Sequence, residues 1–251
     1  MQSGNPALTK NTFLDVANGA LVAHGNDTMT INGTVNKTGL MLILVVVGAM
    51  YSWAQFTGPE SAPAMMPLVL GGAIGGLLLA LVTIFKKTWA PFTAPLYALV
   101  EGVFIGGLSA IFEARYPGIV LQAVGLTFGT MAAMLLAYRS GLIRVTEKFK
   151  LGVVAATGGI LLLYVAQFVM GFFGHSMDFI SGNSFMAIGF SGFVVVIAAL
   201  NLVLDFDLIE SGAQSGAPKY MEWYGAFALT VTLVWLYLEI LRLLSKLQSR
   251  N

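Results

Sequence analysis

The stretch "FMAIGFSGFVVVIAALNLVLDFDLIE", residues 185–210, joins a long apolar run to three acids, Asp205, Asp207 and Glu210. Its apolar part has about the 20 residues that an α-helix needs to cross the hydrocarbon core of a bilayer. The acids follow where that core should end. The stretch therefore predicts a membrane-spanning helix with carboxyl groups at or inside one membrane face.

The composition indicates that the whole chain, and not only this stretch, is typical of a membrane protein. Of the 251 residues, 57% are hydrophobic and only 10% are charged, against roughly 25% charged residues in a typical soluble domain. Mean hydropathy is +0.81. The chain is thus expected to be an integral membrane protein. The absence of cysteine excludes disulfides and thiolate chemistry. The two histidines, His24 and His175, are far apart, which argues against a histidine-based metal site.

Seven stretches are long and apolar enough to span a membrane. They cover residues 39–56, 67–85, 91–112, 119–138, 151–173, 185–206 and 221–245. Only a helical bundle satisfies the backbone in lipid at this length, so the predicted fold class is an all-α integral membrane protein with a seven-transmembrane-helix bundle. Residues 1–38 are expected to form a polar cytoplasmic segment, with one short amphipathic helix around Asn11–Val22, and residues 39–247 the membrane domain.

The orientation is predicted from lysine and arginine, which favour cytoplasmic loops. With a cytoplasmic N-terminus, the inside segments contain nine such residues: Lys10, Lys37, Lys86, Lys87, Arg139, Arg144, Lys148, Lys150 and Lys219. The outside loops contain Arg115 alone. Seven spans place the C-terminus outside, where Arg242, Lys246 and Arg250 are exceptions to the rule. A re-entrant last segment would return those three to the cytoplasm.

Three spans contain an acid: Glu101, Asp205 and Glu239. A charged residue inside a span costs roughly 2.5–3.5 kcal/mol on insertion scales, so such residues usually face protein or water and serve a purpose. On the sixth helix a stripe of small and polar residues contains Ser184, Ala187, Ser191, Ala198, Asn201 and Asp205. On the seventh helix a similar stripe contains Gly225, Ala228, Thr232, Trp235, Glu239, Arg242 and Lys246. Asp205 and Glu239 are therefore expected to face protein.

Each acid also has a purely structural interpretation. Asp207 and Glu210 at the membrane edge are simply solvated in that interpretation, and Glu239 pairs with Arg242 at i, i+3. Glu101 is then hydrogen-bonded between helices, and Glu222 is an acid favoured by the dipole of a helix start. The glycines of the second span, Gly71, Gly72, Gly75 and Gly76, are expected chiefly to permit close helix packing, with a hinge or conduction role as the alternative.

Three motifs resemble the Bax inhibitor-1 family, also called the transmembrane Bax inhibitor motif proteins, and its bacterial members in particular. In "LVLDFDLIE", Asp205 stands at the family's motif Asp and Asp207 where Gln is more common. In "LYLEILRLL", Glu239 replaces the Asp of the last helix. "EGVFIGGLS", around Glu101, is similar to the family's third helix. The resemblance covers about residues 39–247 and implies location in a bacterial inner membrane.

The resemblance implies a bundle in which two carboxylates, on the sixth and seventh helices, share a proton and close a pore. The family is associated with a slow pH-dependent calcium leak, with stress protection, and with modulation of a membrane protease in some bacteria. This sequence departs from the pattern in two respects. Residues 67–85 lack the family's basic residue. If the sixth helix ends near Ser211, Asp205 is level with Ala226, which leaves Glu239 about 20 Å further along the seventh helix.

The leading hypothesis is a pH-regulated cation (calcium) leak channel gated by intramembrane carboxylates. Asp205, Glu239 and Glu101 are its candidate proton- and cation-sensing residues, and Asn201 and Asp207 support them. Transported Ca²⁺ would be met at Asp205, and no bound cofactor is expected. The expected partners are the lipid bilayer, cations, protons and a membrane protease, and no nucleic acid. The alternative is a non-transporting membrane adaptor that modulates a membrane protease or a stress response. No nucleophile–base pair or metal triad indicates an enzyme.

Overall fold

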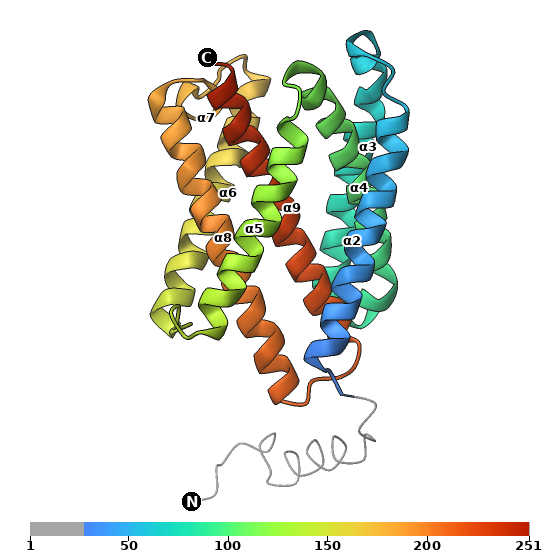
Figure 1. The fold of residues 1–251 in the computed structure, drawn as a ribbon, viewed down its shortest axis with the longest axis vertical. Coiled ribbons are helices and arrows are strands. Elements are labelled where there is room, and N and C mark those ends of the chain that lie inside the picture. The colour runs from blue at the N-terminus through green and yellow to red at the C-terminus, as the bar shows by residue number, and fades with distance from the viewer. Residues whose placement is uncertain (1–27, 251) are drawn as a thin grey trace, which may run out of the picture.

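The computed structural model describes residues 28–250, which form a bundle of helices (Figure 1). Its elements are α2 (Ile31–Ala54), η1 (Pro59–Ser61), α3 (Ala62–Phe85), η2 (Lys87–Trp89), α4 (Ala90–Arg115), α5 (Ile119–Arg139), α6 (Glu147–Phe172), α7 (Asp178–Ser181), α8 (Phe185–Gln214) and α9 (Met221–Gln248). Seven of these helices are long and apolar enough to cross a membrane. The predicted all-α seven-helix class is confirmed. The short helix expected at Asn11–Val22 lies outside the described residues.

Two helices extend well beyond the apolar runs that predicted them. Helix α2 begins at Ile31 instead of 39, because Thr30 caps it by accepting a hydrogen bond from the Gly33 amide. Helix α8 continues to Gln214, past the predicted end at 206. Hydropathy marks only the part of a helix that lies in lipid, whereas backbone hydrogen bonding continues into the polar residues beyond it.

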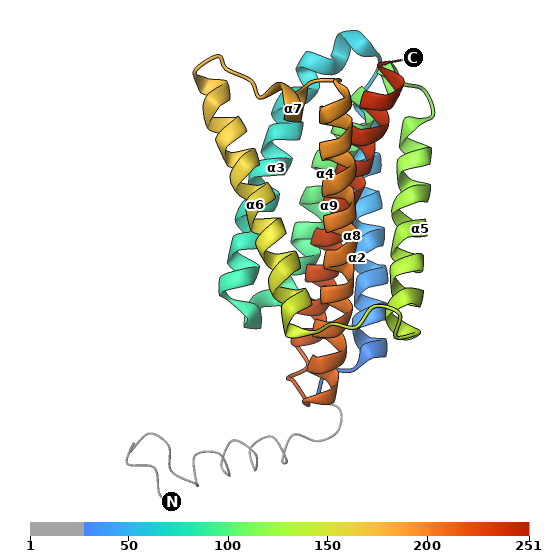
Figure 2. The ribbon, with the colours of Figure 1, turned by 90° about the vertical axis from the view of Figure 1, so that its left-hand side faces the viewer.

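Helix α9 is the centre of the bundle. It packs against α2, α4, α5 and α8, as Figures 1 and 2 show. In its most apolar window 61% of the residues are buried, against 11% in α6 at the outside. Helix α9 therefore brings its polar residues into the protein interior, where each of them needs a partner.

Glycines allow α2, α3 and α4 to approach closely. A side chain at Gly48 of α2 would collide with the Leu99 carbonyl of α4, and one at Gly102 of α4 would collide with the Val45 carbonyl of α2. On α3, Gly72 lies against Phe104 and Gly76 lies against the Glu101 carboxylate. These contacts match the close-packing interpretation of the α3 glycines.

The bundle has two ends. We call the end where α2 begins the proximal end and the opposite one the distal end. The α3–α4, α5–α6 and α8–α9 connections lie at the proximal end, and the α2–α3, α4–α5 and α6–α8 connections lie at the distal end (Figures 1 and 2). Helix α9 is continuous and ends at the distal end. The alternative of a re-entrant last segment is therefore wrong.

Candidate functional site

The polar stripes of α8 and α9 face each other in one register. Lys246 on α9 donates a hydrogen bond to the Ser191 hydroxyl on α8 at 2.8 Å, and the Thr232 hydroxyl on α9 faces the Asp205 carboxyl on α8. Fourteen residues separate Ser191 from Asp205, and fourteen separate Thr232 from Lys246, as antiparallel pairing requires. We call this line of contacts the α8–α9 seam.

Asp205 is the exceptional group of the seam. Its side chain is partly buried, and its Oδ2 atom is enclosed without a hydrogen-bond partner from any described residue. No other buried side-chain oxygen or nitrogen in residues 28–250 is left in this state. Buried polar groups in proteins nearly always have a partner, so an orphaned carboxyl oxygen marks a functional candidate.

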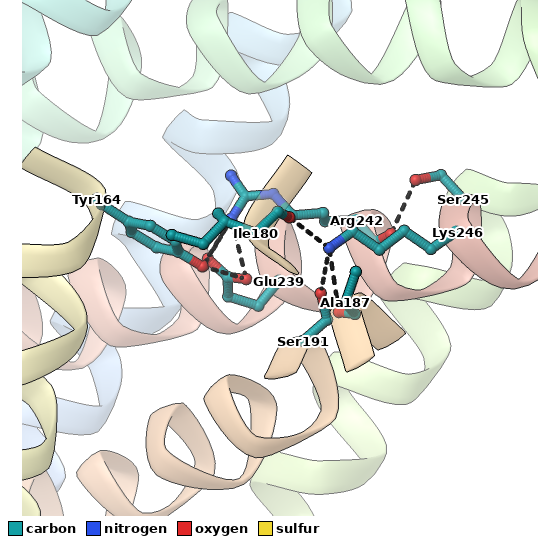
Figure 3. A network of polar contacts seen from close by, with 8 residues as sticks. All are labelled: Tyr164, Ile180, Ala187, Ser191, Glu239, Arg242, Ser245 and Lys246. Atoms are coloured by element: carbon teal, nitrogen blue, oxygen red, sulfur yellow. Dashed lines mark hydrogen bonds and ion pairs between the residues drawn. The ribbon is translucent and has the colours of Figure 1, made fainter. Parts of the chain in front are cut away.

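Glu239 lies on the same face of α9 and has a full set of partners (Figure 3). Its carboxylate, 2% exposed, accepts hydrogen bonds from the Tyr164 hydroxyl at 2.9 and 3.0 Å. It also accepts from Arg242 Nη1, at 3.0 and 3.2 Å, and the same Nη1 contacts the Tyr164 oxygen at 2.7 Å. The i, i+3 pairing of Glu239 with Arg242 is thus observed, and its carboxylate is held away from Asp205.

The proposed pairing of Asp205 with Glu239 does not occur in this structure. The residue opposite Asp205 is Thr232, and Glu239 lies seven residues further along α9, or about 10 Å. The sequence predicted about 20 Å because it ended the sixth helix near Ser211. Helix α8 instead runs to Gln214, which moves the antiparallel register toward the C-terminus of α9.

Glu101 lies on the other side of α9, in the interface of α3 and α4. It is 9% exposed, and its carboxylate packs against Gly76, where a side chain would displace it. Within residues 28–250 it has no ion-pair partner. Glu101 is therefore, like Asp205, an acid enclosed by the bundle without a basic partner among residues 28–250, and it does not meet Asp205.

The supporting residues join α8 to its outer neighbours. The Asn201 amide donates to the Thr157 hydroxyl of α6 at 2.8 Å. Asp207 forms an ion pair with Lys150 of α6 at 3.0 Å. Glu210 accepts a hydrogen bond from the Tyr138 hydroxyl of α5 at 2.5 Å. The interpretation of Asp207 and Glu210 as merely solvated acids is therefore wrong, because both fix α8 to adjacent helices.

A second polar cluster lies at the proximal end, and it was not predicted from the sequence. Glu222, fully buried, accepts hydrogen bonds from the Thr30 amide and hydroxyl, both at 2.9 Å. It also pairs with Lys37 and, at 3.0 Å, with Lys219. We call these four residues the proximal clasp, since they tie the start of α2 to the start of α9. Lys219 at i, i+3 was the only local signal, because Thr30 and Lys37 are distant in sequence.

The described residues contain no group of three or more His, Cys, Asp or Glu side chains that could hold a metal ion. Ca²⁺ takes six to eight oxygen ligands. The Asp205 carboxylate could supply only a minor part of such a shell, so a calcium ion at this point would keep most of its water.

Comparison with protein families identifies the chain. The sequence pattern of the family described as "Bax inhibitor 1 like" matches residues 5–249. The chain belongs to the Bax inhibitor 1 like family. Comparison with curated proteins and with solved structures finds no match. Membership makes the chain a Bax inhibitor-like membrane protein, and it leaves the function to be argued from the seam.

Set against the family resemblance, the seam of this Bax inhibitor 1 like protein has one acid where two were expected. Asp205 stands at the level of the motif acid of the sixth helix, and the α9 residue that faces it is Thr232. Glu239, which was assigned to the second acid from sequence, belongs to a separate ion-pair cluster with Tyr164 and Arg242. Thr232 lies on the predicted polar stripe of α9, seven residues before Glu239, so the stripe contained the residue that faces Asp205.

Proposed function

We propose that this protein is a pH-regulated cation leak channel whose proton-exchanging group is Asp205. The observation that supports the proposal is the enclosed Asp205 Oδ2 atom, which has no partner among the described residues. A carboxylate oxygen enclosed without a cation or a donor carries an uncompensated desolvation cost. Binding a proton, meeting a cation or opening the seam would each relieve that cost.

The proposed mechanism couples these three events. When Asp205 holds a proton, the carboxyl is neutral and the closed packing of α8 on α9 is tolerated. When the proton leaves, the charge favours any arrangement that admits water or a cation. Proton concentration then changes the populations of closed and open bundles. Calcium or another cation would pass the site with part of its hydration shell, because a single carboxylate cannot replace that shell.

The other two candidate acids take different roles in the proposal. Glu239 has its charge balanced by Arg242 and holds α6 to α9 through Tyr164, so we assign it to the framework. Glu101 has no basic partner in the described chain and is enclosed at the α3–α4 interface, so we retain it as a second proton site. Asn201 and Asp207 hold the segment of α8 that carries Asp205.

The test is cation flux into proteoliposomes across a range of pH. Asp205→Asn keeps the size of the side chain and removes its ionisation, so flux through this variant should lose most of its dependence on pH. Glu147→Gln is the matched control, because the Glu147 side chain is 92% exposed and its charge is already solvated. If Asp205→Asn protein follows the wild-type pH curve, Asp205 is not the sensor.

A second function is favoured by the apolar packing between the two polar clusters of the seam. Ala198, Leu202 and Leu236 are fully buried between the levels of Asp205 and Glu239, so the side chains packed there are apolar. A permanently closed bundle would suit the adaptor that modulates a membrane protease or stress response. Wild-type protein that passes no cation at any pH, in liposomes of verified content and orientation, would favour the adaptor.

A further inference from the structure

Lys246 is a buried lysine near the distal end of α9 whose ammonium contacts only oxygen atoms (Figure 3). The residue is 5% exposed. Its Nζ atom donates to the Ile180 carbonyl at 2.6 Å, the Ser191 hydroxyl at 2.8 Å and the Ala187 carbonyl at 3.2 Å. An ammonium group has three donors, and all three are used.

No carboxylate balances this charge directly. The charged groups nearest along α9 are Arg242, one turn away, and Glu239, two turns away, and these two already pair with each other. Lys246 forms no ion pair with any residue of the described chain. Buried charges are usually paired or bound to metals, because their desolvation is costly. Here neutral carbonyl and hydroxyl oxygens replace the lost water instead.

The oxygens come from α7 and α8 and form a cage around the ammonium. Helix α7 has only four residues and ends at Ser181, so helix hydrogen bonding leaves the Ile180 carbonyl without a partner. Ala187 and Ser191 lie one turn apart near the start of α8 and present their oxygens on the same face. Carbonyl oxygens that replace a hydration shell are the means by which ion channels hold dehydrated monovalent cations. We call these three oxygens the distal cage.

We propose that the distal cage is a binding site for a dehydrated monovalent cation or primary ammonium, which the chain occupies with its own Lys246. The tethered ammonium thereby joins α7 and α8 to α9 and seals the distal end of the α8–α9 seam. The binding site stands on its own contacts. Only the effect of the seal on cation flux rests on the proposed channel function.

Chemical rescue tests the site without reference to flux. Lys246→Ala deletes three methylenes and the ammonium, which together correspond to propylammonium. The melting temperature of the purified variant should fall by several degrees and should rise again with millimolar propylammonium. Propanol, which has the same length and no charge, should not restore it, and neither additive should raise the wild-type melting temperature. Arg250→Ala, four residues along and exposed, is the control variant.

The outcomes are distinct. Recovery with propylammonium but not propanol supports the site, and equal recovery or none overturns it. If Lys246→Ala protein is not recovered folded, the same comparison is made on its folded yield, with each additive present during expression and purification. Ser191→Ala provides a milder variant: it removes one cage oxygen, so its melting temperature should fall less than that of Lys246→Ala. A Ser191→Ala melting temperature equal to wild type would count against the cage.

Cation flux then tests the seal. Lys246→Ala proteoliposomes should leak cations several-fold faster than wild type, and propylammonium should reduce the leak. Successful rescue with unchanged flux would overturn the sealing role and leave the site intact. Failure of the proposed channel function appears elsewhere, as wild-type protein that passes no cation at any pH, so the two failures are distinguishable.

Discussion

At the scale of single residues, Thr232 distinguishes the α8–α9 seam of this Bax inhibitor 1 like protein from the expected pair of carboxyls. It faces Asp205, and a hydroxyl can donate to a carboxylate but cannot share its proton as a second carboxyl does. Asp205 is therefore expected to titrate as one group. Glu239 contributes no second acid there, because Tyr164 and Arg242 hold it about two turns away.

Installing the second acid should alter the pH response. In Thr232→Asp, two carboxyls face each other in the seam and cannot both ionise cheaply, so one keeps its proton to higher pH. The midpoint of the pH profile of cation flux should rise by about one pH unit or more. Thr232→Asn is the control of equal size, and its midpoint should stay near that of the wild type. If the pH profiles of cation flux coincide for Thr232→Asp and Thr232→Asn, the residue at position 232 does not affect the protonation of Asp205.

At the scale of elements, the close contact of α3 with α4 depends on particular glycines and not on glycine content. Gly72 lies against Phe104, and a Cβ added at Gly72 would come within 2.9 Å of the Phe104 amide nitrogen. The adjacent Gly71 has nothing within 4 Å of the same added atom. Two neighbouring residues of one helix therefore experience opposite environments.

This difference predicts opposite effects of the same substitution. Gly72→Ala should destabilise the protein by about 1–3 kcal/mol, because the α3 and α4 backbones must move apart. Gly71→Ala should be neutral or stabilising by up to about 1 kcal/mol, since alanine is the better helix former. Thermal unfolding of the two purified variants in one detergent gives the comparison. Equal melting temperatures would mean that α3 does not pack on α4 through Gly72.

At the scale of the whole molecule, the basic residues divide between the two ends for different reasons. At the proximal end most are exposed or partly exposed, as loop residues that select a membrane side should be. At the distal end Lys246 is enclosed in its cage and Arg242 is paired with Glu239. Two of the three exceptions to the positive-inside pattern, Lys246 and Arg242, are thus held by contacts within the bundle, and Arg250 is exposed.

The orientation that follows is testable in cells. We expect the proximal end to face the cytoplasm, because it carries the exposed lysines and arginines. The chain has no cysteine, so a single introduced cysteine reports its own accessibility. Cysteine at Arg144 should resist a membrane-impermeant thiol reagent in intact cells, and cysteine at Glu60 should react with it. Reversed labelling of the two positions would overturn the orientation.

The sequence by itself determined the class of the protein and the place of its helices. Apolar length sets where a helix can cross a bilayer, and this signal is local, so the seven predicted spans lie within the helices observed, apart from small differences at their ends. The stripes of small and polar residues also indicated the faces on which α8 and α9 meet, at Ser191 with Lys246 and at Asp205 with Thr232. The helix ends were harder to predict, because capping by Thr30 and the extension of α8 to Gln214 depend on polar residues outside the lipid.

Only the tertiary structure decided which side chains meet. An antiparallel register depends on where both helices end and on the turn between them. The error of three residues at the end of α8 therefore contributed to predicting Ala226 as the partner of Asp205, six residues from the observed Thr232. The proximal clasp and the distal cage join residues that are distant in sequence, and Tyr164 reaches Glu239 across 75 positions. Such contacts depend on helix packing in three dimensions, which hydropathy and spacing along one chain do not determine.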